Sequence, residues 1–168
     1  NGGQGERIPA WCRRVVQDEQ TKIFSAQVWA PEAPYVFKKK TFKPNTAPLL
    51  IYECHIGMAQ DEEKVGTYIE FKNKVLPRIA ADGYNCIQIM AIAEHPYYGS
   101  FGYHVSNFFA PSSRFGTPEE LKELVDEAML NKVNSDTYKK NGKFYESLFI
   151  DNISKDLYTI TKKKKNDG

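Results

Sequence analysis

The chain has 168 residues, of which 41% are hydrophobic, and carries 23 lysines and arginines against 21 acidic residues. This length and composition are typical of one globular domain, alone or with part of a second, and are sufficient for a buried core. The net charge of +2 gives no global indication of a nucleic-acid or membrane-surface partner. No apolar run approaches the roughly 20 residues of a membrane span.

The three cysteines, Cys12, Cys54 and Cys86, are widely spaced and form no C-x-x-C pair. With no secretory leader ahead of them, they favour reduced thiols and a cytoplasmic protein. The chain begins at Asn1 without an initiator methionine, so we expect it to be cut from something longer.

The first 48 residues combine short extended runs with a proline-rich segment. Residues 13–16 and 23–29 have the β-branched and aromatic content of strands, and the second run alternates near its end as a half-buried strand does. Four prolines within residues 31–48 then predict a connector with an extended middle.

Two apolar runs predict buried strands. Residues 49–57 end in polar groups and Gly57, which predicts a strand buried at its start, and residues 84–92 form the second run. Polar side chains at the end of such strands stand where α/β folds place their sites.

Helical spacing follows each of these strands. Thr67 has the position of an N-cap with Glu70 three residues later, Gly83 ends the helix, and Pro77 predicts a kink or break within it. A second helix begins after Thr117, with a proline in its first position.

Residues 49–128 therefore alternate as strand, helix, strand, long loop and helix, which predicts an α/β fold that opens a parallel sheet or barrel. A third strand is expected next and does not arrive. Residues 129–143 are polar and loop-like, residues 144–150 form a short apolar segment, and residues 157–161 are at most an edge strand.

The long loop, residues 94–116, is the candidate binding segment, and it reads E-H-P-Y-Y-G-S-F-G-Y-H-V-S-N-F-F-A-P-S-S-R-F-G. Aromatic rings cover the apolar face of a pyranose, nearby amides, imidazoles and carboxylates bind its hydroxyls, and glycines let the backbone come close. The same composition is equally typical of an ordinary aromatic loop. G-S-F-G-Y at 99–103 is not a phosphate loop, because neither a lysine nor a helix follows it directly.

Two carboxylates and one thiol are candidates for catalysis. Glu53 and Glu94 lie near the ends of predicted strands, and a retaining glycosyl reaction needs two carboxyl groups about 5–5.5 Å apart. We favour the alternative that they orient neighbouring loops by hydrogen bonding. Cys54 and His55 are neighbours on a strand and point to opposite faces, so thiol chemistry is not expected.

Neither a metal nor any other cofactor is expected. The histidines at 55, 95 and 104 lack metal-ligand spacing. The nine lysines after residue 130, four of them consecutive at 162–165, lack interleaved aromatics, which indicates a solvated tail and no nucleic-acid site.

Several motifs occur in a fixed order: I-Y-E-C-H-I-G at 51–57, V-G-T-Y-x-x-F at 65–71, L-P-R-I at 76–79, G-Y-N-x-I-Q-x-M-A-I-x-E-H at 83–95 and S-F-G-Y at 100–103. Together they closely resemble the eukaryotic-type 1,4-α-glucan (glycogen or starch) branching enzymes of the α-amylase clan, over about residues 6–128. Members of that family cut an α-1,4 glucan, hold the fragment covalently on an aspartate and transfer it to a 6-hydroxyl.

The resemblance implies that residues 1–30 end an N-terminal carbohydrate-binding β-sandwich and that residues 49–128 are the first two βα units of a (β/α)8 barrel. It implies that Tyr103 is the tyrosine that stacks on the glucose beside the scissile bond, and that Asn107 stands where many clan members carry an aspartate. Tyr98 is a further substrate-binding candidate in the same aromatic platform. The implied ligand is an α-1,4-glucan such as glycogen, amylose or amylopectin.

Residues 129–168 depart from the family, which continues into a third strand and, later, the catalytic Asp, Glu and Asp. We therefore expect an incomplete barrel with an unrelated C-terminal tail, no catalytic residue and no branching by this chain alone, and poor solubility or dependence on a partner. The alternatives are a non-catalytic glucan-binding module and a partner-binding module that uses the tail.

Overall fold

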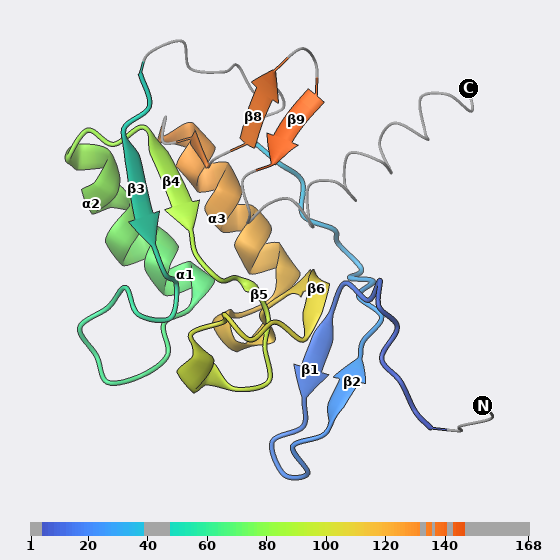
Figure 1. Ribbon diagram of the computed structural model, residues 1–168. Coiled ribbons are helices and arrows are strands. Elements are labelled where there is room, and N and C mark those ends of the chain that lie inside the picture. The colour runs from blue at the N-terminus through green and yellow to red at the C-terminus, as the bar shows by residue number, and fades with distance from the viewer. Residues whose placement is uncertain (1–4, 39–47, 132–133, 136, 141–142, 147–168) are drawn as a thin grey trace, which may run out of the picture.

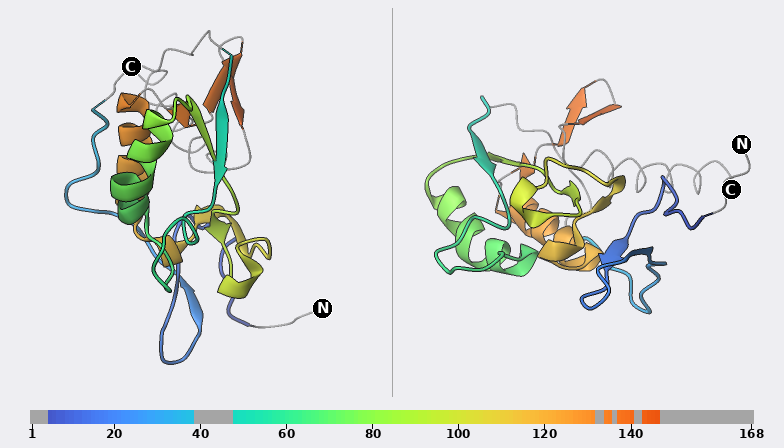
Figure 2. Two further views of the ribbon diagram at one scale, coloured as in Figure 1. Left: turned by 90° about the vertical axis from the view of Figure 1, so that its left-hand side faces the viewer. Right: turned by 60° about the horizontal axis from the view of Figure 1, so that its bottom comes forward.

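A parallel sheet with helices packed on one face forms the main body of the molecule (Figure 1). The computed structural model describes residues 5–38, 48–131, 134–135, 137–140 and 143–146. The sheet has the order β3-β4-β7, and the turned view in Figure 2 shows the helices together on one side of it. Its elements are β3 (Ile51–Cys54), β4 (Cys86–Ile89), β7 (Asn134–Ser135), α1 (Tyr68–Glu70), η1 (Phe71–Val75), α2 (Leu76–Ala81) and α3 (Pro118–Leu130).

The core lies between the sheet and the helices. In the parallel register Tyr52 pairs with Ile87 and Cys54 with Ile89, so these side chains share the face that the helices cover. The helices contribute further buried apolar side chains, including Phe71, Leu76, Ile79, Leu121 and Leu124. The predicted α/β alternation over residues 49–128 is confirmed in this part of the chain.

The prediction that the first strand is buried at its start is wrong. Ile51 is 44% exposed and Leu50 is 55% exposed, whereas Cys54 to Gly57 are buried. The helices cover one face only, so Ile51 and Glu53 point away from them. Burial is concentrated at the carboxyl end of β3, because the rings of Tyr98 and Phe115 close over Gly57 there.

The first helical segment begins as predicted at Thr67, whose side chain accepts the N–H of Glu70 while Glu70 accepts the N–H of Thr67. The predicted disturbance at Pro77 takes the form of η1, a π-helical segment in which the N–H of Leu76 donates to the carbonyl of Phe71. Proline has no N–H and crowds the carbonyl four residues back, so the turn ahead of it widens. The helix ends before Gly83, which has a φ of +86°.

Two predictions are wrong in part: that residues 129–143 are loop-like, and that no third strand follows the second helix. Residues 129–143 include the end of α3, the two residues of β7 that pair in parallel with β4, and β8 (Thr137–Lys140), which forms an antiparallel hairpin with β9 (Lys143–Glu146). Neither β7 nor β8 has an apolar pattern that would mark it as a strand. The predicted edge strand at 157–161 lies outside the described residues.

An N-terminal hairpin packs against the beginning of α3. It consists of β1 (Val15–Gln17) and β2 (Phe24–Ala26), which lie within or beside the two predicted extended runs and pair antiparallel. The buried Arg14 donates to the carbonyl of Gly116 at 2.8 Å and lies 5.1 Å from the ring of Trp29. The indole N–H of Trp29 donates to Glu119 in the first turn of α3.

The connector is also fastened to α3. Asp126 is fully buried in α3 and accepts hydrogen bonds from the Tyr35 hydroxyl at 2.7 Å and from the Lys38 N–H at 2.8 Å. Burial and the hydrogen bond to Asp126 raise the pKa of Tyr35. Residues 35–38 of the connector therefore lie against α3.

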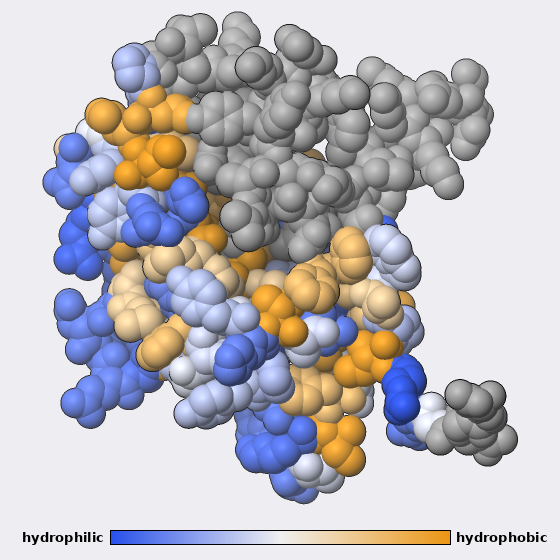
Figure 3. Space-filling view, viewed as in Figure 1, coloured by the Kyte–Doolittle hydropathy of each residue, from blue (hydrophilic) through white to orange (hydrophobic). Residues whose placement is uncertain are grey.

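Apolar surface gathers over the start of β3 and over β6 (Asn107–Pro111), as the orange areas of Figure 3 show. Leu50 and Ile51 account for the first area, and Phe108, which is 64% exposed, contributes to the second. In the described part of the chain, no helix has both the length and the apolar content that crossing a membrane requires.

The N-cap of α3 allows a first test. Thr117→Ala removes the side-chain acceptor for the Glu120 N–H and should lower the free energy of unfolding by about 1 kcal/mol. Thr117→Ser keeps the hydroxyl and should stay close to the parent in urea unfolding followed by circular dichroism. Equal losses for the two substitutions would show that the methyl group, rather than the cap, matters.

Candidate functional site

The aromatic loop is anchored by a short antiparallel strand pair. β5 (Ala93–Glu94) pairs with β6, and the Ser106 N–H donates to the carbonyl of Glu94 at 2.8 Å, so the two ends of the loop meet. The sequence predicted one continuous loop here. The strand pair was missed because β5 has only two residues and the register shifts within it, which leaves no alternating pattern to recognise.

Glu94 holds the base of this loop. Its side chain is fully buried, and its carboxylate accepts the Ser113 N–H at 2.7 Å and the His95 N–H at 3.1 Å. This confirms for Glu94 the hydrogen-bonding role that we favoured over catalysis. Glu53 lies exposed on β3, and its carboxylate faces away from the core.

Arg114 adds a second fastening at the same place. Its guanidinium donates to the carbonyl of Pro96 at 2.8 Å, to that of His95 at 3.4 Å, and to the side-chain oxygen of Gln17 at 3.3 Å. The loop is therefore joined to β1 of the N-terminal hairpin. Sequence reasoning missed this residue, since a single arginine after a loop carries no pattern.

Tyr103 is the most open of the three predicted site residues. Its side chain is 68% exposed, its N–H donates to the Ser100 carbonyl at 3.0 Å, and its hydroxyl lies 3.7 Å from the sulfur of Met90. It directly follows Phe101 and Gly102, which have left-handed φ values of +52° and +85°. A left-handed non-glycine residue costs of order 1–3 kcal/mol and clusters at functional sites.

Tyr98 and Asn107 lie closer to the interior. Tyr98 (in η2, Tyr98–Ser100) is half-buried between the rings of His55, His95 and Phe101, and burial raises the pKa of its hydroxyl. Asn107 opens β6 and is only 8% exposed. All three predicted residues lie in the 94–116 segment, and Tyr103 is the most exposed of them.

Neither thiol nor metal chemistry gains support. Burial raises the pKa of Cys54 to about 12, with a smaller contribution from the charge of Glu53, and its thiol donates to the Gln88 carbonyl at 3.7 Å. A thiol with such a pKa is not a nucleophile at neutral pH. Among the residues that the structure describes, no group of three or more potential ligands is placed to hold a metal ion.

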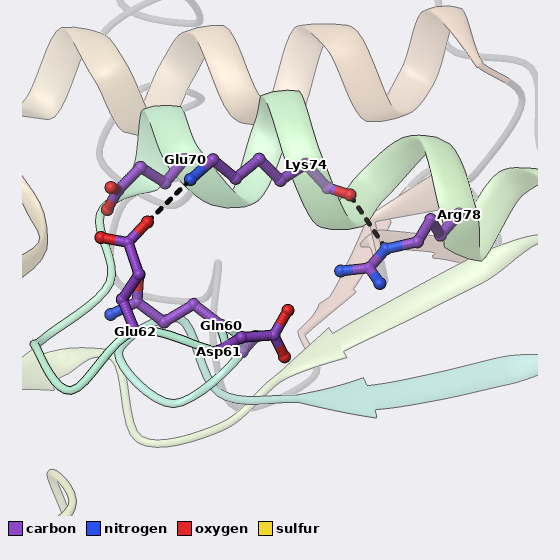
Figure 4. A pocket seen from close by; sticks show the side chains of 7 residues that line it. Gln60, Asp61, Glu62, Glu70, Lys74 and Arg78 are labelled. Carbon is purple, nitrogen blue, oxygen red and sulfur yellow. Dashed lines mark hydrogen bonds and ion pairs between the residues drawn. The ribbon is translucent and has the colours of Figure 1, made fainter.

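A small polar hollow of about 70 Å³ lies between the loop after β3 and the helices that follow it (Figure 4). Across it the Lys74 ammonium lies 3.1 Å from a Glu62 oxygen, and the Arg78 Nε donates to the Lys74 carbonyl at 3.1 Å. No aromatic ring lines it, so it lacks the apolar face that a pyranose stacks on. Its lining residues are Ala59, Gln60, Asp61, Glu62, Glu70, Lys74 and Arg78.

Comparison of the fold places the chain among α-amylase-type structures. A crystal structure of a protein assigned as an alpha amylase from Salmonella typhimurium superposes with a TM-score of 0.53 and 24% identity, covering 65% of this chain and 19% of that one. This likeness defines the class of fold. No family model matches the chain.

Comparison of the sequence is more specific. Over 129 residues the chain is 54% identical to the 1,4-alpha-glucan-branching enzyme of Dictyostelium discoideum, and over 136 residues it is 52% identical to that of Saccharomyces cerevisiae; each match covers 76% of this chain. The enzyme of the same name from Equus caballus is 52% identical over 123 residues. The chain belongs to the 1,4-alpha-glucan-branching enzyme family and spans about a fifth (17–19%) of the length of these relatives.

The ion pair of Lys64 with Glu70, one of the residues that line the polar hollow, allows a test by pH. Glu70 accepts a hydrogen bond from the Lys64 ammonium at 2.6 Å, which lowers the pKa of that carboxyl below its usual 4.5. The ionised carboxylate therefore stabilises the folded chain above about pH 4.5, and this stabilisation is lost as the pH falls through the lower folded pKa. Glu70→Gln, which keeps a capping acceptor, should make urea midpoints between about pH 5 and 3 less dependent on pH.

The exposed Glu63 in the same loop is the control for this prediction. Glu63→Gln should leave the pH dependence of the urea midpoint close to that of the parent. If Glu70→Gln and Glu63→Gln give the same profile, the ion pair with Lys64 does not contribute to stability.

Proposed function

We propose that the chain forms part of the glucan-binding side of a 1,4-alpha-glucan-branching enzyme, with Tyr103 as the ring on which a glucose unit stacks. The observation that carries the proposal is an exposed tyrosine on a tightly anchored loop, in a chain that is 54% identical to a branching enzyme. The loop lies at the carboxyl ends of β3 and β4, where α/β folds bind their ligands. Tyr98 and Asn107, in the same loop segment, are the further candidate contacts to the glucan.

The same proposal includes the wider architecture. Residues 49–128 would be the first two βα units of a (β/α)8 barrel, residues 1–30 the end of a β-sandwich, residues 31–48 a linker, and residues 129–168 a tail unrelated to the family. The exposed Leu50 and Ile51 support a sheet that continues beyond β3. Hydrogen bonds from the connector to Asp126 support a fixed, rather than loose, linker.

The ligand would be an α-1,4-glucan, and the protein would act in the cytoplasm. The names of the relatives specify a 1,4-alpha-glucan as what those enzymes branch. The three cysteines of the chain are free thiols, which supports a reducing compartment.

We also propose that the chain by itself transfers no glucan. Glycosyl transfer needs a nucleophile and an acid, and the family resemblance assigns neither role to a residue here. Glu94 is buried and already accepts two backbone hydrogen bonds. Glu53 and Glu94 therefore do not replace the missing pair.

Binding can be measured by electrophoresis in native gels with and without glycogen. Retardation by glycogen is expected for the parent chain, and Tyr103→Ala should weaken it by about tenfold or more, as truncation of a central aromatic contact does. Phe108→Ala is the matched control, because Phe108 is 64% exposed but lies on β6. Equal weakening by both substitutions, or a parent chain that glycogen does not retard, would overturn the proposal.

Activity can be measured by the iodine absorbance of amylose incubated with the chain. No shift is expected from the purified chain, whereas a complete branching enzyme from one of the relatives serves as the positive control. A shift of the same kind from the purified chain would show that this chain carries out the chemistry itself and would overturn the proposal.

A further inference from the structure

His55 contacts the loop from the end of the first sheet strand. It directly follows β3, is 6% exposed, and its ring packs edge-on against the rings of Phe101 and Phe115. Its Nε2 lies 2.9 Å from the carbonyl oxygen of Phe101. Since a carbonyl oxygen only accepts, Nε2 carries the hydrogen and donates it to the loop.

This is the one hydrogen bond that orients the imidazole within the described part of the chain. The other ring nitrogen, Nδ1, is buried and has no hydrogen-bond partner among the described residues. Buried polar side-chain groups are normally hydrogen-bonded, most often to backbone or water. Here the ring is bonded to the backbone of a surface turn.

The turn that His55 contacts also packs against Ala91, two residues beyond the end of β4. Gly102 lies so close to the Ala91 carbonyl that a Cβ on Gly102 would come within 2.1 Å of that oxygen. Phe101, Gly102 and Ala91 all have left-handed φ values, of +52°, +85° and +50°. Non-glycine residues keep such conformations only where their surroundings hold them.

The placement of Tyr103 follows from the contacts of this turn with His55 and Ala91. Its backbone N–H closes the turn onto Ser100, and its ring is 68% exposed, with the hydroxyl 3.7 Å from the sulfur of Met90. A turn free to relax to ordinary φ values would redirect the chain immediately before Tyr103. The direction of the exposed ring therefore depends on the two contacts made by the strand ends.

We propose that His55 is a positioning residue for glucan binding: through its hydrogen bond to Phe101 it holds the left-handed turn that presents the Tyr103 ring. This rests on the proposed function of Tyr103. It assigns His55 no contact with the sugar and no step in the reaction.

The experiment compares His55→Leu, which cannot donate, with His55→Gln, whose amide can, in the full 168-residue chain. In amide hydrogen exchange, His55→Leu should expose the N–H groups of Phe101 and Tyr103 about tenfold more while the amides of β4 stay protected. In glycogen gels its dissociation constant should rise about tenfold, and His55→Gln should remain within about threefold of the parent.

Two further variants separate positioning from a general loss of structure. In a Tyr103→Ala background, His55→Leu should cause no additional loss of glycogen retardation, because its effect acts through Tyr103. Gly102→Ala disturbs the same turn from the side of Ala91 and should reproduce the exchange and binding changes with His55 in place. This second variant also tests the proposal if His55→Leu fails to fold.

Unchanged exchange at Phe101 and Tyr103 in both His55→Leu and Gly102→Ala would overturn the proposal. So would a loss of binding by His55→Leu that persists undiminished in the Tyr103→Ala background, or a His55→Gln variant as weak as His55→Leu. If glycogen does not retard the parent chain, the proposed function fails, and the exchange data still decide whether His55 holds the turn.

Discussion

The buried carboxylate of Glu94 is the interaction on which the architecture of this chain depends. It accepts N–H groups from both sides of the aromatic loop, at His95 and at Ser113. A buried carboxylate is stable only when such hydrogen bonds replace its lost hydration, and loss of one partner is correspondingly costly. The two ends of the loop therefore meet at one buried, hydrogen-bonded carboxyl group.

Around this point, arginine side chains join separate parts of the chain by donating to backbone carbonyls. Arg14 binds the carbonyl of Gly116 and Arg114 binds that of Pro96, so cationic side chains join the N-terminal hairpin, the loop and α3. Charge-assisted bonds of this kind are directional as well as strong. They give the aromatic loop a rigid base without burying its tip.

The elements that the sequence predicted are those with a local signature. The two capping boxes, at Thr67 and Thr117, need only four residues each to be recognised, and the two apolar runs that became β3 and β4 are continuous. Their stabilising partners lie within the same segment or are supplied by general burial.

The features that the sequence did not predict depend on residues far apart in the chain. Burial at the end rather than the start of β3 depends on Tyr98 and Phe115, more than 40 residues away. β5 and β7 have two residues each, too few to show a period, and the five residues of β6 do not alternate between apolar and polar. In the candidate site, the aromatic loop and its tyrosines were predicted from composition and family motifs. The half-buried position of Tyr98 and the bond from His55 to Phe101 were not, because they depend on tertiary packing.

The attachment of the connector to Asp126 has a consequence for recombination of this protein with its relatives. A single crossover after Lys38 would place the Tyr35 hydroxyl and the Asp126 carboxylate that accepts its hydrogen bond in segments from different parents. A chimera that takes the hairpin, the connector through Lys38 and α3 from the same parent keeps the bond from Lys38 to Asp126. It also keeps Arg14 with the segment that leads into α3. The natural unit of exchange in this region is therefore discontinuous, consisting of the N-terminal 38 residues together with α3.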